Sequence, residues 1–301
     1  MSLRDWFEKA QKEGWALGAF NIDTLETLRA VCEAAKVNKS PVIVEFSPGE
    51  VEYFGIKNVI DITANAKEEY DLPIFLNLDH GKSKEACFDA VELSNEERPR
   101  VEPEVAPRFD MVHFDGSQFE TTENIKAARE IVESAHKKGI LVEGEIDKVS
   151  GASQINPAEL NLELLKQSYT DPKKAADFVK ETGVDIFAAV FGNVHGVFDV
   201  QPDLDFELLA AIRTTLGDTF ISMHGGSGIP KEDVTRAIEV GRIVKINVNT
   251  ELRQAYKDAL GEELSEKPDE YAFYNISPDV VMAIQAVVEN KMDVFGSSGK
   301  S

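Results

Sequence analysis

The sequence of 301 residues predicts an α/β fold, a closed (β/α)8 barrel of the TIM-barrel type. Eight short apolar runs alternate with amphipathic stretches, and the runs are rich in the β-branched and aromatic residues of buried parallel strands. Most runs end at polar side chains, which a barrel gathers at one mouth. An open doubly wound sheet is the alternative, but it would spread these side chains along a wide edge. Such barrels run to about 250 residues or more, so one domain can span residues 1–301.

The eight apolar runs are the predicted strands. Most are bounded by glycine, proline, aspartate or asparagine, as strands that end in turns are. They cover residues 16–22, 41–46, 73–79, 111–115, 141–146, 186–192, 220–224 and 243–248.

Amphipathic stretches between the runs are the predicted helices. In residues 124–138 the apolar positions recur at steps of three and four, so one helix face is buried. Further helices are predicted at residues 25–35, 172–182 and 231–240.

Two segments interrupt this alternation. Residues 95–108 are charged and rich in proline, which predicts a surface insertion. Residues 147–169 are expected to form a mobile loop over the functional end of the barrel, with a helical portion at 158–167.

The charge and cysteine content exclude several classes of protein. With 32 basic and 54 acidic side chains, the net charge of −22 repels nucleic acid and anionic membranes, whereas anionic metabolites remain permitted. No apolar run approaches the roughly 18 residues of a membrane helix, and no secretory signal precedes the first strand. Cys32 and Cys87 are too few for a disulfide framework. These features predict a soluble, cytoplasmic protein.

Three of the five histidines, His80, His195 and His224, follow strands, and each precedes a glycine. Three imidazoles from three strand ends can hold a catalytic Zn²⁺ with an open fourth position, although unrelated surface histidines are the alternative. His113, within a strand, is expected to be a core histidine. His136, late in a helix, is expected to interact with the helix dipole.

Asp79 directly precedes His80 at the end of an apolar strand. A carboxylate there is costly unless it is paired or functional, so we expect a general acid or base beside the metal. The alternative is a helix cap, but Ser83 is better placed for that role.

Further polar groups mark the seventh and eighth strand ends and the barrel interior. The segment HGGSGIP (224–230) and the segment NVNTELR (247–253) each join a strand to a helix, where exposed amides bind anions. Ordinary turns and a helix cap are the alternative. Glu143, Glu145 and Asp115 are expected to support the metal or to hold a second cation, because the two glutamates alternate along one strand and so face one side.

In order along the chain, the segments GAFNI, PVIVEFSPGE, LNLDHGKSKEAC, DGSQFETTENI, LVEGEI, FGNVHGVF, HGGSGIP and KINVNTELR resemble the class II, metal-dependent fructose-bisphosphate and tagatose-bisphosphate aldolases. The resemblance covers nearly the whole chain. It implies a homodimer or homotetramer that acts on a sugar phosphate, with Zn²⁺ held by His80, His195 and His224, a nearby monovalent cation (Na⁺ or K⁺), and Asp79 handling the substrate proton. The implied phosphate and substrate contacts are Asn21, Ser47, Gly196, Gly225, Ser227, Asn247, Asn249 and Thr250.

Two positions depart from the pattern of the family. Ser153 and Gln154 stand where relatives have an acidic pair in a loop, and Asp147 is the nearest carboxylate. Tyr274 stands near the place of an arginine for the distal phosphate. The resemblance implies cleavage of a ketose bisphosphate, by default fructose 1,6-bisphosphate, to dihydroxyacetone phosphate and glyceraldehyde 3-phosphate. The alternatives are a zinc- and phosphate-binding paralogue with weak or no cleavage, and a barrel lyase or isomerase for another sugar phosphate.

Overall fold

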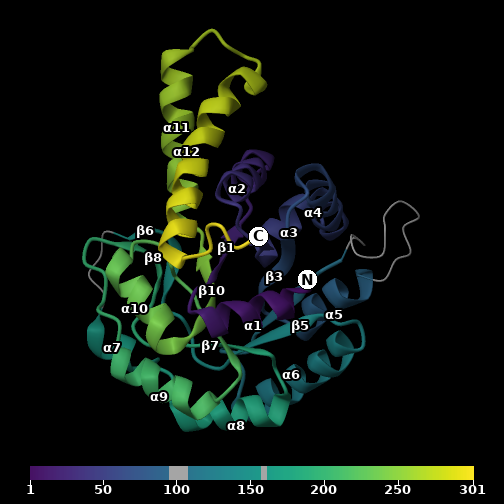
Figure 1. Ribbon diagram of the computed structural model, residues 1–301, viewed down its shortest axis with the longest axis vertical. Helices are drawn as coiled ribbons and strands as arrows, with labels where there is room; N and C mark the ends of the chain where they lie inside the picture. Colours follow the sequence, from purple (N-terminus) through teal and green to yellow (C-terminus); the bar gives the residue numbers. More distant parts are fainter. Residues whose placement is uncertain (95–107, 157–160) are drawn as a thin grey trace.

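Eight parallel strands close into a barrel, which confirms the predicted fold class (Figure 1). The structure, a computed structural model, describes residues 1–94, 108–156 and 161–301. Around the barrel the strands lie in the order β1-β10-β9-β7-β5-β4-β3-β2. Each corresponds to one of the eight apolar runs: β1 (Leu17–Asn21), β2 (Val42–Phe46), β3 (Ile74–Gly81), β4 (Met111–Asp115), β5 (Leu141–Glu145), β7 (Ile186–Ala188), β9 (Phe220–Met223) and β10 (Ile243–Val248).

Helices surround the barrel, and the four predicted ones are confirmed as α2, α6, α8 and α10. The helices of the described residues are α1 (Leu3–Glu13), α2 (Leu25–Asn38), α3 (Pro48–Phe54), α4 (Ile56–Tyr70), α5 (Lys84–Leu93), α6 (Thr121–His136), α7 (Leu162–Gln167), α8 (Pro172–Thr182), α9 (Phe206–Leu216), α10 (Lys231–Gly241), α11 (Thr250–Glu266) and α12 (Phe273–Phe295). None of them combines the length and the apolar character that crossing a membrane requires.

Local sequence signals set helix boundaries, as α8 illustrates. The Asp171 side chain accepts hydrogen bonds from the backbone N–H groups of Lys173 and Lys174, and Pro172 occupies the first turn, where its missing N–H costs nothing. The helix stops at Gly183, whose φ of 76° is the left-handed conformation that glycine adopts without a steric penalty.

The segment 147–169 contains more regular structure than the sequence indicates. The strand β6 (Gly151–Asn156) pairs in parallel with β8 (His195–Phe198) in a separate two-stranded sheet. The expected helix is present as α7, and residues 157–160 lie outside the described part. The expected motion of this segment stays a prediction. The expected insertion at 95–108 also lies outside the described residues, except for residue 108.

The barrel interior is apolar at its amino-terminal end. Inward residues of all eight strands pack there with Trp6 and Phe7 of α1, which closes this end. They are Leu17 and Ala19 of β1 and one residue from each other strand: Ile43, Phe75, Met111, Leu141, Ile186, Phe220 and Val244. This layer gives the barrel a solid floor beneath its polar groups.

A buried polar layer lies above this floor. Because side chains alternate along a strand, residues two positions further on face the interior as well. Five of them are polar and fully buried: Glu45, Asn77, His113, Glu143 and Ser222. Lys245, one position after Val244 and next to a register shift in β10, is also fully buried and completes the layer. The sequence predicts only Glu143 from this layer as a site residue.

Candidate metal centre and active site

A pocket of about 420 Å³ opens above the polar layer, at the carboxyl ends of the barrel strands. Two predicted site residues, His224 and Glu143, are fully buried beside it. The other predicted residues line it: Asn21, Ser47, Asp79, His80, Asp115, Glu145, His195, Gly196, Gly225, Ser227, Asn247, Asn249 and Thr250. The barrel therefore brings together all the groups that the strand ends were expected to supply.

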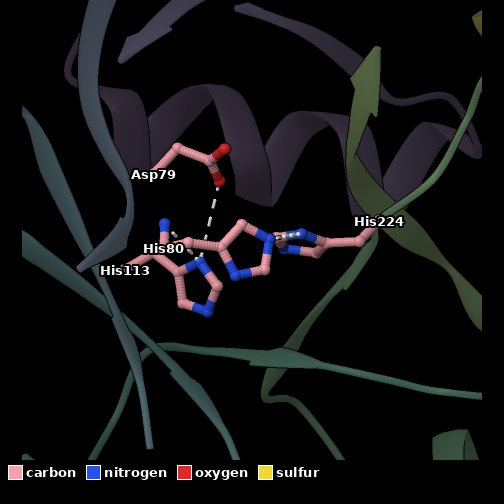
Figure 2. A group of neighbouring side chains, drawn as sticks. All are labelled: Asp79, His80, His113 and His224. Atoms are coloured by element: carbon pink, nitrogen blue, oxygen red, sulfur yellow. Dashed lines mark hydrogen bonds and ion pairs between the residues drawn. The ribbon is translucent and has the colours of Figure 1, made fainter. Parts of the chain in front are cut away.

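Four imidazoles meet at the floor of this pocket. The ring centroid of His80, at the end of β3, lies 5.0 Å from that of His195 and 4.7 Å from that of His224. The rings of His195 and His224 are 5.9 Å apart. His113 of β4 is the fourth, with its centroid 4.6 Å from that of His80 (Figure 2). His113 is buried, as the sequence predicts, but it lies within the cluster rather than apart from it.

Two carboxylates fix the protonated nitrogens of His80 and His224. His80 Nδ1 lies 3.0 Å from Asp115 Oδ2, and His224 Nε2 lies 2.8 Å from Glu143 Oε1. A carboxylate only accepts, so in the neutral rings these nitrogens carry the hydrogens. The other two nitrogens, His80 Nε2 and His224 Nδ1, then face each other with lone pairs at 3.0 Å.

This pairing fits a divalent cation. Two nitrogen ligands of a tetrahedral zinc lie about 3.3 Å apart, close to the observed separation. Carboxylates that orient metal-bound imidazoles through the second ring nitrogen are a general feature of such sites. Asp79, His80, His113 and His224 also offer ligand atoms that all lie within 4.8 Å of one another. His195 lies outside this tighter group and contributes a ring on the pocket side.

Carboxylates outnumber lysines around the cluster. Among the described residues, five carboxylates are buried there with one lysine, Lys245, and the imidazoles. The carboxylates belong to Glu45, Asp79, Asp115, Glu143 and Glu145. Buried charges of one sign are costly unless a partner compensates them, so this excess favours a bound cation.

Lys245 holds the floor of the site in place. Its Nζ lies 3.0 Å from Glu143 Oε2 and donates to Asn247 Oδ1 at 2.8 Å. Burial alone would lower the pKa of Lys245, but the carboxylates of Glu143 and Glu45 raise it above its ordinary value. A lysine that stays protonated is a poor nucleophile, which argues against a Schiff base at this position.

The histidine pKa values favour neutral rings at two of the three proposed ligand positions. At the third, burial would lower the pKa of His80, but the carboxylates of Asp79 and Asp115 raise it. Burial, followed by the neighbouring imidazoles, holds the pKa of His195 well below its ordinary value. Burial also lowers the pKa of His224, against the opposing effect of Glu143. Neutral imidazoles have the lone pairs that a metal requires.

Asp79 is held by two amide groups. Asn21 Nδ2 donates to its Oδ2 at 3.2 Å, and Asn247 Nδ2 donates to its Oδ1 at 3.1 Å. Burial would raise the pKa of Asp79, but the neighbouring imidazole of His80 and the contact with His113 hold it well below the ordinary value. Asp79 is thus an ionised base, 4% exposed, beside the imidazoles.

Glycine-rich turns form the opposite wall of the pocket. Gly225 has a φ of 69°, and a Cβ there would lie 2.0 Å from the carbonyl oxygen of Val194, so only glycine fits. Ser227 follows in the same turn, and Asn249 and Thr250 begin α11. The amino-terminal end of a helix and these polar side chains together suit a bound phosphate.

Arg253 is a positively charged pocket residue that the sequence analysis does not indicate. Arg253 lines the pocket from the first turn of α11, where it pairs with Asp23 and with Glu50 Oε1 at 2.8 Å. Its position three residues after Thr250 in a helix could have indicated this, because such residues share a helix face. Lys82 and Lys148 also line the pocket. Tyr274, in contrast, lies at the start of α12, 79% exposed and outside the pocket lining.

The loop after β5 brings no carboxylate to the pocket from residues 148–154. Its lining residues are Lys148, Val149, Gly151, Ala152 and Ser153. Asp147 does not line the pocket. Burial, together with the charge of Glu145, raises the pKa of Asp147 to about 6, and Thr170 is its hydrogen-bond partner.

The raised pKa of Asp147 predicts a pH-dependent cost in stability. Below pH 3.8, the ordinary pKa that the unfolded chain has, the carboxyl is protonated in both states and its favourable contribution to the free energy of unfolding is complete. This contribution is lost as the pH rises through about 6, the pKa in the folded protein. Asp147→Asn should therefore raise the free energy of unfolding by roughly 2–3 kcal/mol at pH 7.5 and by little below pH 4. Urea unfolding across this pH range measures the effect, with the exposed Asp177→Asn as a control. Equal effects at both ends of the range would contradict it.

Comparisons with known proteins agree with this geometry. Residues 1–300 match the family described as fructose-bisphosphate aldolase class-II. The chain is 35% identical over 304 aligned residues to the fructose-bisphosphate aldolase of Geobacillus stearothermophilus, covering 100% of this chain and 98% of that protein.

Solved structures show the same architecture. The YdjI aldolase of Escherichia coli K12 superposes with a TM-score of 0.81 at 30% identity, covering 99% of this chain and 98% of that one. The fructose-bisphosphate aldolase of Campylobacter jejuni has a TM-score of 0.80 at 21% identity, over 100% and 97% of the two chains, and supports the fold alone. The matched family and the identity over the full length lead to one conclusion: the chain belongs to the class II fructose-bisphosphate aldolase family.

Proposed function

We propose that this protein is a zinc-dependent aldolase that reversibly cleaves a ketose bisphosphate, with fructose 1,6-bisphosphate as the default substrate. The products are dihydroxyacetone phosphate and glyceraldehyde 3-phosphate. The observation that carries the proposal is the pair of imidazole nitrogens, His80 Nε2 and His224 Nδ1, that face each other at 3.0 Å beside the carboxylate of Asp79.

His80, His195 and His224 are the proposed ligands, with Asp115 and Glu143 orienting two of the rings. A bound Zn²⁺ supplies Lewis-acid stabilisation of the negative charge that develops on the substrate during cleavage. Glu145 is proposed to add negative charge next to His80, from which its Oε2 lies 3.7 Å away.

Asp79 takes the proton of the C4 hydroxyl in the cleavage direction. As the C4 carbonyl forms, the C3–C4 bond breaks, and its electron pair stays with the half that becomes dihydroxyacetone phosphate. Carbon 3 of that half then takes up a proton. Asn21 and Asn247 keep both oxygens of Asp79 fixed during this transfer.

The phosphate of the dihydroxyacetone half is proposed to bind the turns at Gly196 and Gly225 and the start of α11, with a monovalent cation nearby. Ser227, Asn249 and Thr250 supply polar groups there, and Asn21 and Ser47 contact the substrate. Arg253 is the proposed contact for a distal anionic group, because it lies in the pocket whereas Tyr274 does not.

Cleavage with and without a chelator tests the proposal. Purified protein is incubated with fructose 1,6-bisphosphate, tagatose 1,6-bisphosphate and other sugar phosphates, and the triose products are measured. We expect cleavage that disappears when the metal is removed and returns with Zn²⁺. Cleavage that survives complete removal of metal would exclude the proposed mechanism, and products other than a triose phosphate pair would indicate a lyase or isomerase of another kind.

One observation favours a second candidate, a zinc- and phosphate-binding paralogue with weak cleavage. Ser153 lines the pocket where relatives have an acidic loop residue, and the loop residues 148–154 contain no carboxylate. Stoichiometric zinc and phosphate binding without measurable turnover on the whole panel would support this candidate.

The family resemblance also leads us to propose a homodimer or homotetramer, for which light scattering is the test. Both cysteines are free and buried, which supports the proposed cytoplasmic location.

A further inference from the structure

His113 is the imidazole of the cluster to which neither the family resemblance nor the proposed mechanism gives a role. It lies in the middle of β4 and has no exposed surface. Its ring centroid is 4.6 Å from that of His80 and 4.9 Å from that of His224. Figure 2 shows the ring of His80 between those of His113 and His224.

One nitrogen of His113 is tied to the backbone of His80. The backbone N–H of His80 donates to His113 Nδ1 at 3.1 Å. The regular β3–β4 register shifts between Leu78 and Gly81, so strand pairing is interrupted here. A buried backbone N–H must find another acceptor, and the side chain of His113 provides it.

The backbone of His80 needs this support. Its φ of 45° is in the left-handed region, which is unusual for a residue other than glycine. Such a conformation is strained and persists only when the surroundings enforce it. This conformation directs the His80 ring between Asp115 on one side and His224 on the other.

The second nitrogen of His113 faces Glu145. Because Nδ1 accepts a hydrogen bond, Nε2 carries the hydrogen of the neutral ring. His113 Nε2 and Glu145 Oε2 are 3.1 Å apart, without the alignment of a full hydrogen bond, and both atoms are buried with no other hydrogen-bond partner. The contact restrains a carboxylate that also lies 3.7 Å from His80 Nδ1.

We propose that His113 is a positioning residue of the metal centre. Its Nδ1 holds the left-handed backbone of His80, and its Nε2–H restrains Glu145, so it acts on metal binding without being a ligand. Its Nδ1 faces the His80 amide and, at 3.7 Å, Asp79 Oδ1, and its Nε2 faces Glu145, so neither nitrogen faces another imidazole nitrogen as those of His80 and His224 do. The inference rests on the proposed function, in that it requires the site to bind a divalent cation.

Two substitutions separate the roles of the two nitrogens. His113→Asn places an amide oxygen near the position of Nδ1, so it can keep the hydrogen bond from His80. His113→Gln reaches the position of Nε2 instead and loses the acceptor for His80. His113→Phe keeps a ring of similar size and loses both nitrogens.

Competition with a chromophoric chelator gives the dissociation constant for Zn²⁺, and the visible spectrum of the Co²⁺-loaded protein reports the ligand set. We expect His113→Phe and His113→Gln to weaken Zn²⁺ binding by roughly 10- to 100-fold, as the loss of supporting contacts does in other metal sites. His113→Asn should keep most of the wild-type affinity for Zn²⁺. The Co²⁺ bands should stay at the wild-type position in all three variants.

Two results would overturn the inference. A changed Co²⁺ spectrum in His113→Asn and His113→Gln would show that His113 is a metal ligand. Wild-type affinity for Zn²⁺ in both variants would show that its ring only packs in the core. If His113→Phe fails to fold, the comparison of the asparagine and glutamine variants still tests the positioning role of His113. Circular dichroism checks that these two variants are folded. A wild-type protein that binds neither metal would instead refute the proposed function, so the two failures are distinguishable.

Discussion

Replacing His80, His195 or His224 by alanine is expected to abolish cleavage and to remove the bound metal. Each variant loses one of three nitrogen donors, and the stabilisation of developing charge that the metal supplies amounts to several kcal/mol. We therefore expect kcat/KM to fall by roughly 10³-fold or more. Metal content per chain, measured by mass spectrometry of the eluted element, should fall together with activity.

His195→Ala is the most informative of the three variants. His195 lies outside the tight group of Asp79, His80, His113 and His224, although its ring is 5.0 Å from that of His80. His136→Ala is the matched control, because His136 pairs with Asp185 at the end of α6, on the outside of the barrel. If His195→Ala retained stoichiometric metal, the ligands would be those of the tight group, and the ligand set proposed from the sequence would be wrong.

The barrel could be predicted because its strands carry strong local signals. Runs such as PVIVEF and PIFLNLD are apolar, short and bounded by turn residues, and their polar ends share one rim in any closed parallel barrel. The same rule predicted that His80, His195 and His224 would meet, although each comes from a different part of the chain. Topology alone brings strand ends together, so no knowledge of side-chain packing was needed.

The polar layer inside the barrel could not be predicted in the same way. His113 appears as one polar residue in the apolar run MVHFD, and its partners, the His80 amide and Glu145, lie on the two neighbouring strands. Lys245 likewise meets Glu45 and Glu143 only after the barrel closes. Contacts of this kind depend on strand register, which the order of residues within one strand does not define.

The other differences between the predicted and the observed structure lie in segments whose sequences carry weak local signals. The residues GASQIN of β6 have no apolar alternation, and their partner strand β8 begins about 40 residues later, so nothing local predicts their pairing. Strand ends do not predict Arg253, because it enters the pocket from the first turn of a helix.

Asp79→Asn is expected to lower kcat for aldol cleavage by roughly 10²- to 10⁴-fold, the usual contribution of a general base. The amide has nearly the same shape as the carboxylate but cannot accept a proton at neutral pH. One of the two amide groups now bound, that of Asn21 or that of Asn247, would then face a donor and would have to turn. Metal content should not change, in contrast to the histidine variants, and Asp89→Asn on the exposed face of α5 is the control.

A partial reaction locates the proton that Asp79 transfers. Dihydroxyacetone phosphate alone can exchange a hydrogen of its hydroxymethyl carbon with solvent, and this step does not involve the C4 hydroxyl. If Asp79 serves the C4 hydroxyl, Asp79→Asn should lose cleavage while deuterium exchange into dihydroxyacetone phosphate persists. Equal losses of exchange and cleavage would show that Asp79 transfers the proton of the hydroxymethyl carbon instead. That result would also explain how a chain with Ser153 and Gln154 in its loop could work without a carboxylate there.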